Sequence, residues 1–159
     1  PLPEAQLDRF LMKLEMGYPD KNAEVEILNR FLSDNPITEL GSVCKKQDII
    51  DMKKQAKEVY IHPALIEYIA ELAGATRKLS DVAIGISPRG SIAMVNAAKA
   101  YAYVKGRDYV VPSDIKELSV CVWAHRLVFG TGIVSKDGRA QAVNSAFAQV
   151  AVPTEEWTK

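Results

Sequence analysis

The chain has 159 residues, its 20 lysines and arginines are balanced by 20 aspartates and glutamates, and 48% of its residues are hydrophobic. This length fits one domain with a substantial core, and zero net charge gives no overall attraction to nucleic acid or to an anionic membrane. The two cysteines and two histidines lack zinc-finger spacing, and neither a membrane-spanning apolar run nor a signal peptide is visible. We therefore expect a cytoplasmic protein with free thiols at Cys44 and Cys121. Because the chain starts at Pro1 rather than Met, we also expect it to be a fragment of a longer protein.

The N-terminal segment predicts a short helical turn followed by a strand. Pro3 and Glu4 favour a turn over residues 3–9, and apolar and polar side chains alternate over residues 10–16. Since a strand needs a partner, we expect its sheet to lie in a part of the protein outside this chain. The sequence GYPD at 17–20 is typical of a turn and predicts a domain boundary.

The remaining sequence predicts a helical bundle. Apolar residues recur at helical spacing, and proline, glycine and capping residues punctuate the segments. The predicted segments are a helix capped by Asp20 with Val25, Leu28, Phe31 and Leu32 on one side, one near 47–57, one from Pro63 to Gly74, one from Pro88 to about Lys105, one that starts at Pro112 or after a Ser113 cap, and a weaker amphipathic segment around 139–149. The alanine-rich helix from Pro88 is apolar nearly all round, which predicts a central position.

Arg89 is the residue whose position asks for an explanation. In the sequence SPRG, Ser87 and Pro88 form a typical helix start, where the partial positive charge of the helix end disfavours a cation. An anion bound at the same N-terminus would compensate, because both the free N–H groups and the guanidinium attract it, and Gly90 would leave room beside it. The alternative is an arginine that pairs with a carboxylate elsewhere in the fold.

Arg9 in LDRF raises the same question, since the short turn before it can hold it at the surface. The alternative is an ordinary arginine at a helix end, paired with Glu4 or Asp8. For His125 and Arg126 in WAHRL we expect a structural role, because cations suit the C-terminal end of a helix. The chain contains no phosphate-binding loop, metalloprotease or serine-hydrolase motif.

Five stretches, in this order, resemble the C-terminal part of MoxR-type AAA+ ATPases. They are PLPEAQLDRF, GYPDKNAEVEIL, LAGATRKL, GISPRGSIAMVNAAKAYAYVKGRDYVVPSDI and WAHRL. The resemblance runs from residue 1 to about residue 128. It implies that residues 1–17 are the end of the α/β ATPase core, as a short helix–strand remnant, and that residues 18–159 are a mainly α AAA+ lid.

The resemblance also implies roles for the two arginines. Arg89 would be the sensor 2 residue, which with Ser87 and Pro88 approaches the γ-phosphate of ATP bound by the same subunit. Arg9 would be the arginine finger, which acts on ATP held by the neighbouring subunit. The family's P-loop, Walker B acidic pair and sensor 1 have no counterpart in this sequence. ATP and Mg²⁺ are therefore expected in the full-length protein, and this chain alone is expected to be inactive.

The function implied by the resemblance is the lid of a chaperone-like ATPase that remodels or matures partner proteins. The expected partners are neighbouring subunits of a homo-oligomeric ring, expected to be a hexamer, and client proteins that can carry von Willebrand A domains, with no nucleic acid and no membrane span. Two alternatives stay open: a helical protein-interaction domain in which Arg9 and Arg89 are structural, and the lid of a motor that acts on nucleic acid, against which zero net charge argues.

Overall fold

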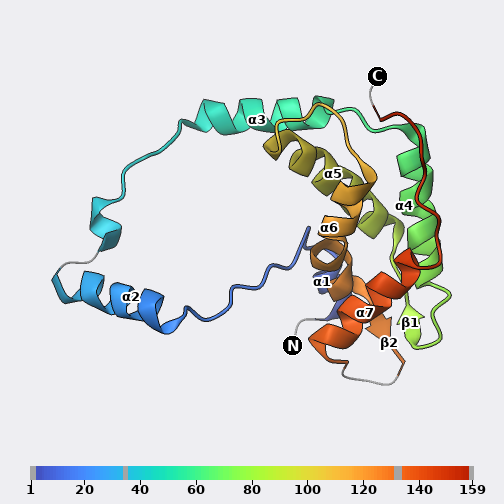
Figure 1. The fold of residues 1–159 in the computed structure, drawn as a ribbon, viewed down its shortest axis with the longest axis horizontal. Helices are drawn as coiled ribbons and strands as arrows, with labels where there is room; N and C mark the ends of the chain where they lie inside the picture. The colour runs from blue at the N-terminus through green and yellow to red at the C-terminus, as the bar shows by residue number, and fades with distance from the viewer. Residues whose placement is uncertain (1–2, 34–35, 131–133, 158–159) are drawn as a thin grey trace. The chain divides into compact units, whose positions relative to one another are not determined.

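The structure is a computed structural model that describes residues 3–33, 36–130 and 134–157. It is mainly helical, as predicted, and the strands in the described part of the chain form one small sheet (Figure 1). Contacts divide the chain into two compact units. The larger unit combines the residues up to Lys13 with those from Lys53 onward, and the smaller one contains Leu14–Met52. The expected boundary between residues 17 and 18 stays a prediction.

The larger unit contains most of the helices and the sheet. Its elements in chain order are α1 (Glu4–Leu7), the end of α3 (Lys46–Glu58), α4 (Pro63–Thr76), β1 (Val82–Ile84), α5 (Pro88–Val104), α6 (Pro112–Trp123), the 3₁₀ helix η2 (Ala124–Arg126), β2 (Val128–Phe129) and α7 (Lys136–Phe147). The smaller unit contains α2 (Lys21–Ser33), the 3₁₀ helix η1 (Pro36–Glu39) and the start of α3.

A hydrophobic core joins α4, α5, α6 and α7 of the larger unit. Helix α5 packs against both α4 and α6, but it is not surrounded on all sides as its apolar composition predicts, because Ile92 and Val104 are exposed. Small side chains make this close packing possible, because alanine lets neighbouring helices approach α5. The buried alanines of α5 are Ala93, Ala97, Ala98 and Ala102. Trp123, the last residue of α6, is completely buried and is the largest side chain in the core.

The ends of the helices follow local hydrogen bonds. Helix α2 begins after Asp20, whose carboxylate accepts a hydrogen bond from the N–H of Ala23 (2.8 Å), as the predicted cap requires. Helix α4 was expected to end at Gly74 but continues to Thr76, because its glycine keeps a helical backbone and the Thr76 hydroxyl donates to the carbonyl of Ala73 (2.6 Å).

Helix α6 begins at Pro112, the first of the two predicted starts. The residue at its cap is Val111, not Ser113. The carboxylate of Asp114 accepts the N–H of Val111 (2.9 Å), so a side chain inside the helix replaces a capping hydroxyl. The same carboxylate pairs with Arg107 (2.6 Å), which fixes the loop between α5 and α6.

The strand predicted for residues 10–16 does not form. Residues 12–20 have no regular secondary structure, and the sheet that does form is antiparallel, with Val82 opposite Phe129. The residues alternate between apolar and polar, but the described residues place no second strand beside them, so the ladder of backbone hydrogen bonds is missing. Instead, the N–H of Lys13 donates to the carbonyl of Cys121 (2.8 Å), and Met12 packs against the core.

Two helical glycines make a matched test of this packing. A methyl group at Gly90 would lie 2.7 Å from Ile86 Cγ2, whereas one at Gly74 would meet nothing within 4 Å. We expect Gly90→Ala to lower the free energy of unfolding by about 1–3 kcal/mol through overpacking. Gly74→Ala should raise it by up to about 1 kcal/mol through helix propensity. Urea denaturation measures both, and equal effects would contradict the packing described for α5.

Candidate functional site

The N-terminus of α5 presents Arg89 to solvent. Ser87 occupies the cap, where its Oγ accepts a hydrogen bond from the N–H of Gly90 (3.3 Å), and Pro88 is the first helical residue. Arg89 is exposed, and its side chain makes no hydrogen bond or ion pair with any residue that the structure describes. No described carboxylate pairs with Arg89, although the carboxylate of Asp8 accepts the hydroxyl of Ser87 at the same helix start.

Arg9 has a similar environment, just after α1. Its backbone N–H donates to the carbonyl of Gln6 (3.1 Å), and its side chain is exposed. Over the described part of the chain, no ion pair or hydrogen bond engages its guanidinium, and Asp8, one of the two partners considered, pairs with Arg126 instead. The side chain of Glu4, the other candidate, lies outside the described residues.

Arg126 joins the two segments that contain these exposed arginines. Its side chain is only 2% exposed, and its Nη1 donates to the carboxylate of Asp8 (2.8 Å). The same carboxylate accepts the hydroxyl of Ser87 at 3.2 and 3.3 Å from its two oxygens. Asp8, Ser87 and Arg126 thus form a cluster, which we call the junction cluster, between residues that are 79 and 118 positions apart.

The remaining donors of Arg126 are also used. Nε donates to the carbonyl of Val122 (2.8 Å), and the two terminal nitrogens reach the backbone carbonyls of Asp8, Phe10 and Leu11. A buried guanidinium is costly unless its charge is paired and its N–H groups are bonded, and this one satisfies both conditions. The sequence predicts a structural role for Arg126 at a helix end, but it does not indicate the partner Asp8, which is 118 positions away.

Gly90 does not leave the open space that the sequence suggested. A Cβ there would lie 2.7 Å from Ile86 and 3.2 Å from Cδ of Arg126, so the side chain of Arg126 passes directly over the first turn of α5. The carbonyl of Gly90 also accepts the indole N–H of Trp123 (3.0 Å). The first turn of α5 therefore packs against Arg126 and Trp123 at Gly90, while Arg89 is exposed.

His125 lies beside the junction cluster. Its Nε2 is 3.2 Å from the carbonyl of Phe10, and since a carbonyl only accepts, Nε2 is the protonated nitrogen. Its Nδ1 is buried and has no partner among the described residues. Burial lowers the pKa of His125 below its usual value, the charge of Arg126 lowers it further, and the Phe10 carbonyl and Asp8 act in the opposite direction.

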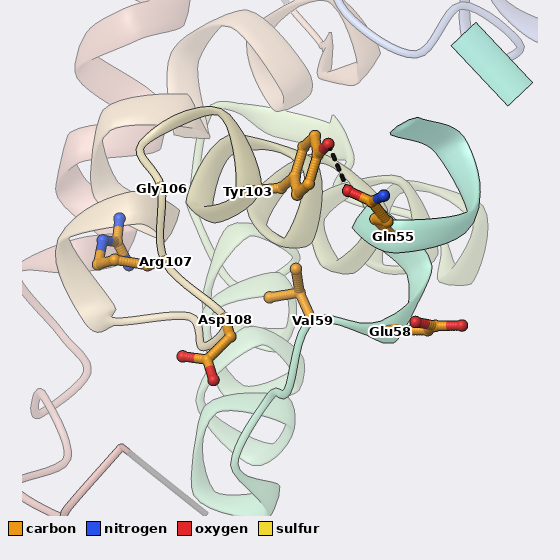
Figure 2. Close-up of a pocket in the computed structure, with 7 residues that line it drawn as sticks. All are labelled: Gln55, Glu58, Val59, Tyr103, Gly106, Arg107 and Asp108. Carbon is orange, nitrogen blue, oxygen red and sulfur yellow. Dashed lines mark hydrogen bonds between the residues drawn. The ribbon is translucent and has the colours of Figure 1, made fainter. Parts of the chain in front are cut away.

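A shallow hollow of about 360 Å³ lies elsewhere in the larger unit. It is lined by residues of α3, of the end of α5 and of the loop that follows (Figure 2). The hydroxyl of Tyr103 donates to Gln55 across it (2.7 Å). None of Arg9, Ser87, Pro88 and Arg89 lines this hollow.

The described residues show two further absences. No group of three or more histidine, cysteine, aspartate or glutamate side chains could hold a metal ion among them. No described helix combines the length and apolar character needed to cross a membrane.

Comparison with known proteins identifies close relatives. Residues 74–153 match the profile of the AAA lid domain family. The uncharacterized protein YeaC of Bacillus subtilis is 41% identical over 98% of this chain and 49% of its own length, and the chaperone MoxR1 of Mycobacterium tuberculosis is 36% identical over 96% and 43%. The Paracoccus denitrificans protein MoxR is 27% identical over 96% of this chain and 51% of its own.

A solved structure has the same fold. It belongs to a provisionally assigned ATPase from Cytophaga hutchinsonii, with a TM-score of 0.85 and 32% identity over 97% of this chain and 50% of that one. The chain thus spans about half the length of the relatives that it matches.

The pKa of His125 makes stability depend on pH. Because the folded chain holds this imidazole neutral below its usual pKa, the unfolded chain binds more protons as the pH falls through about 6.5. The free energy of unfolding should therefore be highest above pH 6.5 and decline as the pH falls toward the lowered pKa. Chemical denaturation at pH values from about 7.5 to about 5, in steps of about 0.5, measures this decline.

His125→Gln should remove this part of the pH dependence. His62→Gln removes the other histidine of the chain and serves as the control, which should keep the slope. An unchanged slope in His125→Gln would contradict the assignment.

Proposed function

The chain belongs to the AAA lid domain family of MoxR-type AAA+ ATPases, and from this membership we propose that it is the C-terminal lid half of such an ATPase, in which it couples ATP hydrolysis to the remodelling of partner proteins. The observation that carries the proposal is the exposed guanidinium of Arg89 in the first turn of α5, which has no hydrogen-bond or ion-pair partner among the described residues. A guanidinium that is available for binding suits a phosphate, because its planar fork of donors matches the phosphate oxygens.

In this proposal Arg89 acts as sensor 2. Its guanidinium binds the γ-phosphate of ATP held by the core of the same subunit, and its planar fork of donors matches phosphate oxygens. Ser87 and Pro88 support this role because they set the first turn of α5, from which Arg89 extends. ATP supplies the transferable phosphoryl group, and Mg²⁺ would be held by core residues outside this chain.

Arg9 acts as the arginine finger in the same proposal. It would reach the ATP of the neighbouring subunit and stabilise the charge that spreads over the phosphoryl oxygens during transfer. An arginine in this position contributes about 10³ to 10⁵ in rate in GTPases. Its exposure, and the lack of a partner for it among the described residues, leave it available to a second subunit.

Motion of the lid would be the output of hydrolysis. While ATP is bound, Arg89 ties α5 to the nucleotide, and loss of the γ-phosphate removes that tie. The Mycobacterium tuberculosis relative is named a chaperone, and this supports a remodelling role. A ring of subunits, clients with von Willebrand A domains and a cytoplasmic location stay predictions.

The proposal is tested with Arg89→Ala and Arg9→Ala in the full-length subunit. Each should lower kcat for ATP hydrolysis by about 100-fold or more, because each removes positive charge from the transferring phosphoryl group. Arg89→Ala should also weaken ATP binding, whereas Arg9→Ala should leave it nearly unchanged, since its target phosphate sits on the neighbour. Lys116→Ala, which removes an exposed cation of α6, is the control and should keep both quantities.

Mixing the two variants separates action within a subunit from action between subunits. A site made by an Arg9→Ala subunit next to an Arg89→Ala subunit contains both arginines, so mixed assemblies should recover part of the hydrolysis. No recovery would exclude the assigned geometry. Unchanged hydrolysis in both variants would instead favour a helical interaction domain with structural arginines.

The chain by itself should not bind ATP at micromolar concentrations. The sequence contains no P-loop, so Arg89 and one helix N-terminus would have to hold the whole triphosphate. Calorimetric titration of the isolated chain with Mg-ATP measures this, and the full-length subunit is the positive control. Micromolar affinity in the isolated chain would contradict the proposed division of labour between core and lid.

A further inference from the structure

The junction cluster fixes the backbone on both sides of each exposed arginine. We infer that Asp8 and Arg126 are positioning residues. They fix the backbone positions of Arg9 and Arg89 relative to each other, so that each guanidinium can contact its own phosphate at the same time. The inference rests on the proposed function and adds two residues to it. Neither residue was expected to have this role from the sequence.

Arg126 fixes the segment around Arg9. Its guanidinium binds the carbonyls of Asp8 and Phe10, the residues immediately before and after Arg9. It also binds the side chain of Asp8 (2.8 Å). With both neighbours held by one buried group, the direction in which Arg9 leaves the backbone is set, while its side chain stays exposed.

The first turn around Arg89 is fixed in a corresponding way. On one side, the hydroxyl of Ser87 donates to the carboxylate of Asp8 and accepts the N–H of Gly90. On the other side, the carbonyl of Gly90 accepts the indole N–H of Trp123, and Cδ of Arg126 lies against the same residue. Arg89 is therefore the residue of this turn that faces outward between two held positions.

The carboxylate of Asp8 connects the two halves of this arrangement. It accepts from Arg126, which holds the Arg9 segment, and from Ser87, which caps the Arg89 helix. A force on Arg89 from its own phosphate is passed through Ser87 and Asp8 to the backbone of Arg9. Because Arg9 serves the neighbouring subunit in the proposed function, this contact would link adjacent ATP sites.

Energetics favour a positioning role over a purely stabilising one. A buried ion pair gains little net stability over a well-packed apolar replacement, because both charges lose their hydration. What such a pair does provide is a single geometry, since the guanidinium and carboxylate accept few arrangements. Arg107 and Asp114 form a second ion pair in the same unit, away from both arginines, and this pair is the natural control.

The test is Asp8→Asn in the full-length subunit. The amide keeps the size of the side chain but removes its charge and one of its two acceptor oxygens. Spin labels at Arg9→Cys and Arg89→Cys, with Cys44→Ser and Cys121→Ser, report the distance between the two positions. We expect a narrow distance distribution in the labelled protein that keeps Asp8, and a broad distribution in the same labelled protein with Asp8→Asn.

Hydrolysis gives the second measurement, without labels. Asp8→Asn should lower kcat by about 2- to 30-fold, the range of mutations that alter coupling between sites. Nucleotide affinity should fall less than in Arg89→Ala, because the guanidinium is still present, and the Hill coefficient for ATP should move toward one. Asp114→Asn should lower the melting temperature but keep a narrow distance distribution, the kcat and the Hill coefficient.

The outcomes separate this inference from the proposed function. A narrow distribution and unchanged kcat in a folded Asp8→Asn protein overturn the inference, even if Arg9→Ala and Arg89→Ala abolish hydrolysis. If those two variants hydrolyse ATP normally, the proposed function fails, whatever the distance measurement shows. Should Asp8→Asn not fold, Ser87→Ala breaks the same bridge and keeps the Asp8–Arg126 pair. An unbroadened distance in that variant then overturns the inference.

Discussion

The ion pair between Arg126 and Asp8 is the interaction on which the arrangement of the larger unit depends. It connects the N-terminal segment to the turn after α6, and Asp8 extends it to the start of α5. Loss of the Asp8 carboxylate would leave a buried guanidinium without its counter-charge, and loss of Arg126 would leave three backbone carbonyls without this donor. Removing one partner of such a pair costs about 3–5 kcal/mol, because the remaining charge stays buried and unpaired. The pair therefore holds the two exposed arginines on one structural unit.

Local signals in the sequence account for most of the helices. Ser87-Pro88 and His62-Pro63 mark helix starts that the structure reproduces, and the alanine-rich composition of α5 agrees with its packing against both α4 and α6. The exposed position of Arg89 also follows from its place in the first turn. These features depend on residues close together in the sequence, so helix propensity and capping rules can predict them.

The junction cluster could not be predicted in the same way. Asp8 and Arg126 are 118 positions apart, and each looks ordinary in its own segment: a carboxylate near a short helix and a cation near a helix end. The strand expected at residues 10–16 fails for a related reason. Alternation shows that a segment can form a strand, but only a partner at the right distance makes it one. A family resemblance assigns roles to Arg9 and Arg89 without indicating what orients them.

Helix α5 is held at both ends by an ion-paired contact. Ser87 reaches the Arg126–Asp8 pair at its start, and the loop after its end is closed by Arg107 and Asp114. A helix of 17 residues is about 25 Å long, so a tilt of about 5° at one end moves the other by about 2 Å. The far end carries Tyr103, which is bonded to Gln55 of α3. Because α5 is held at both ends, a displacement of its first turn in the proposed function would be carried along the helix to Tyr103 and α3.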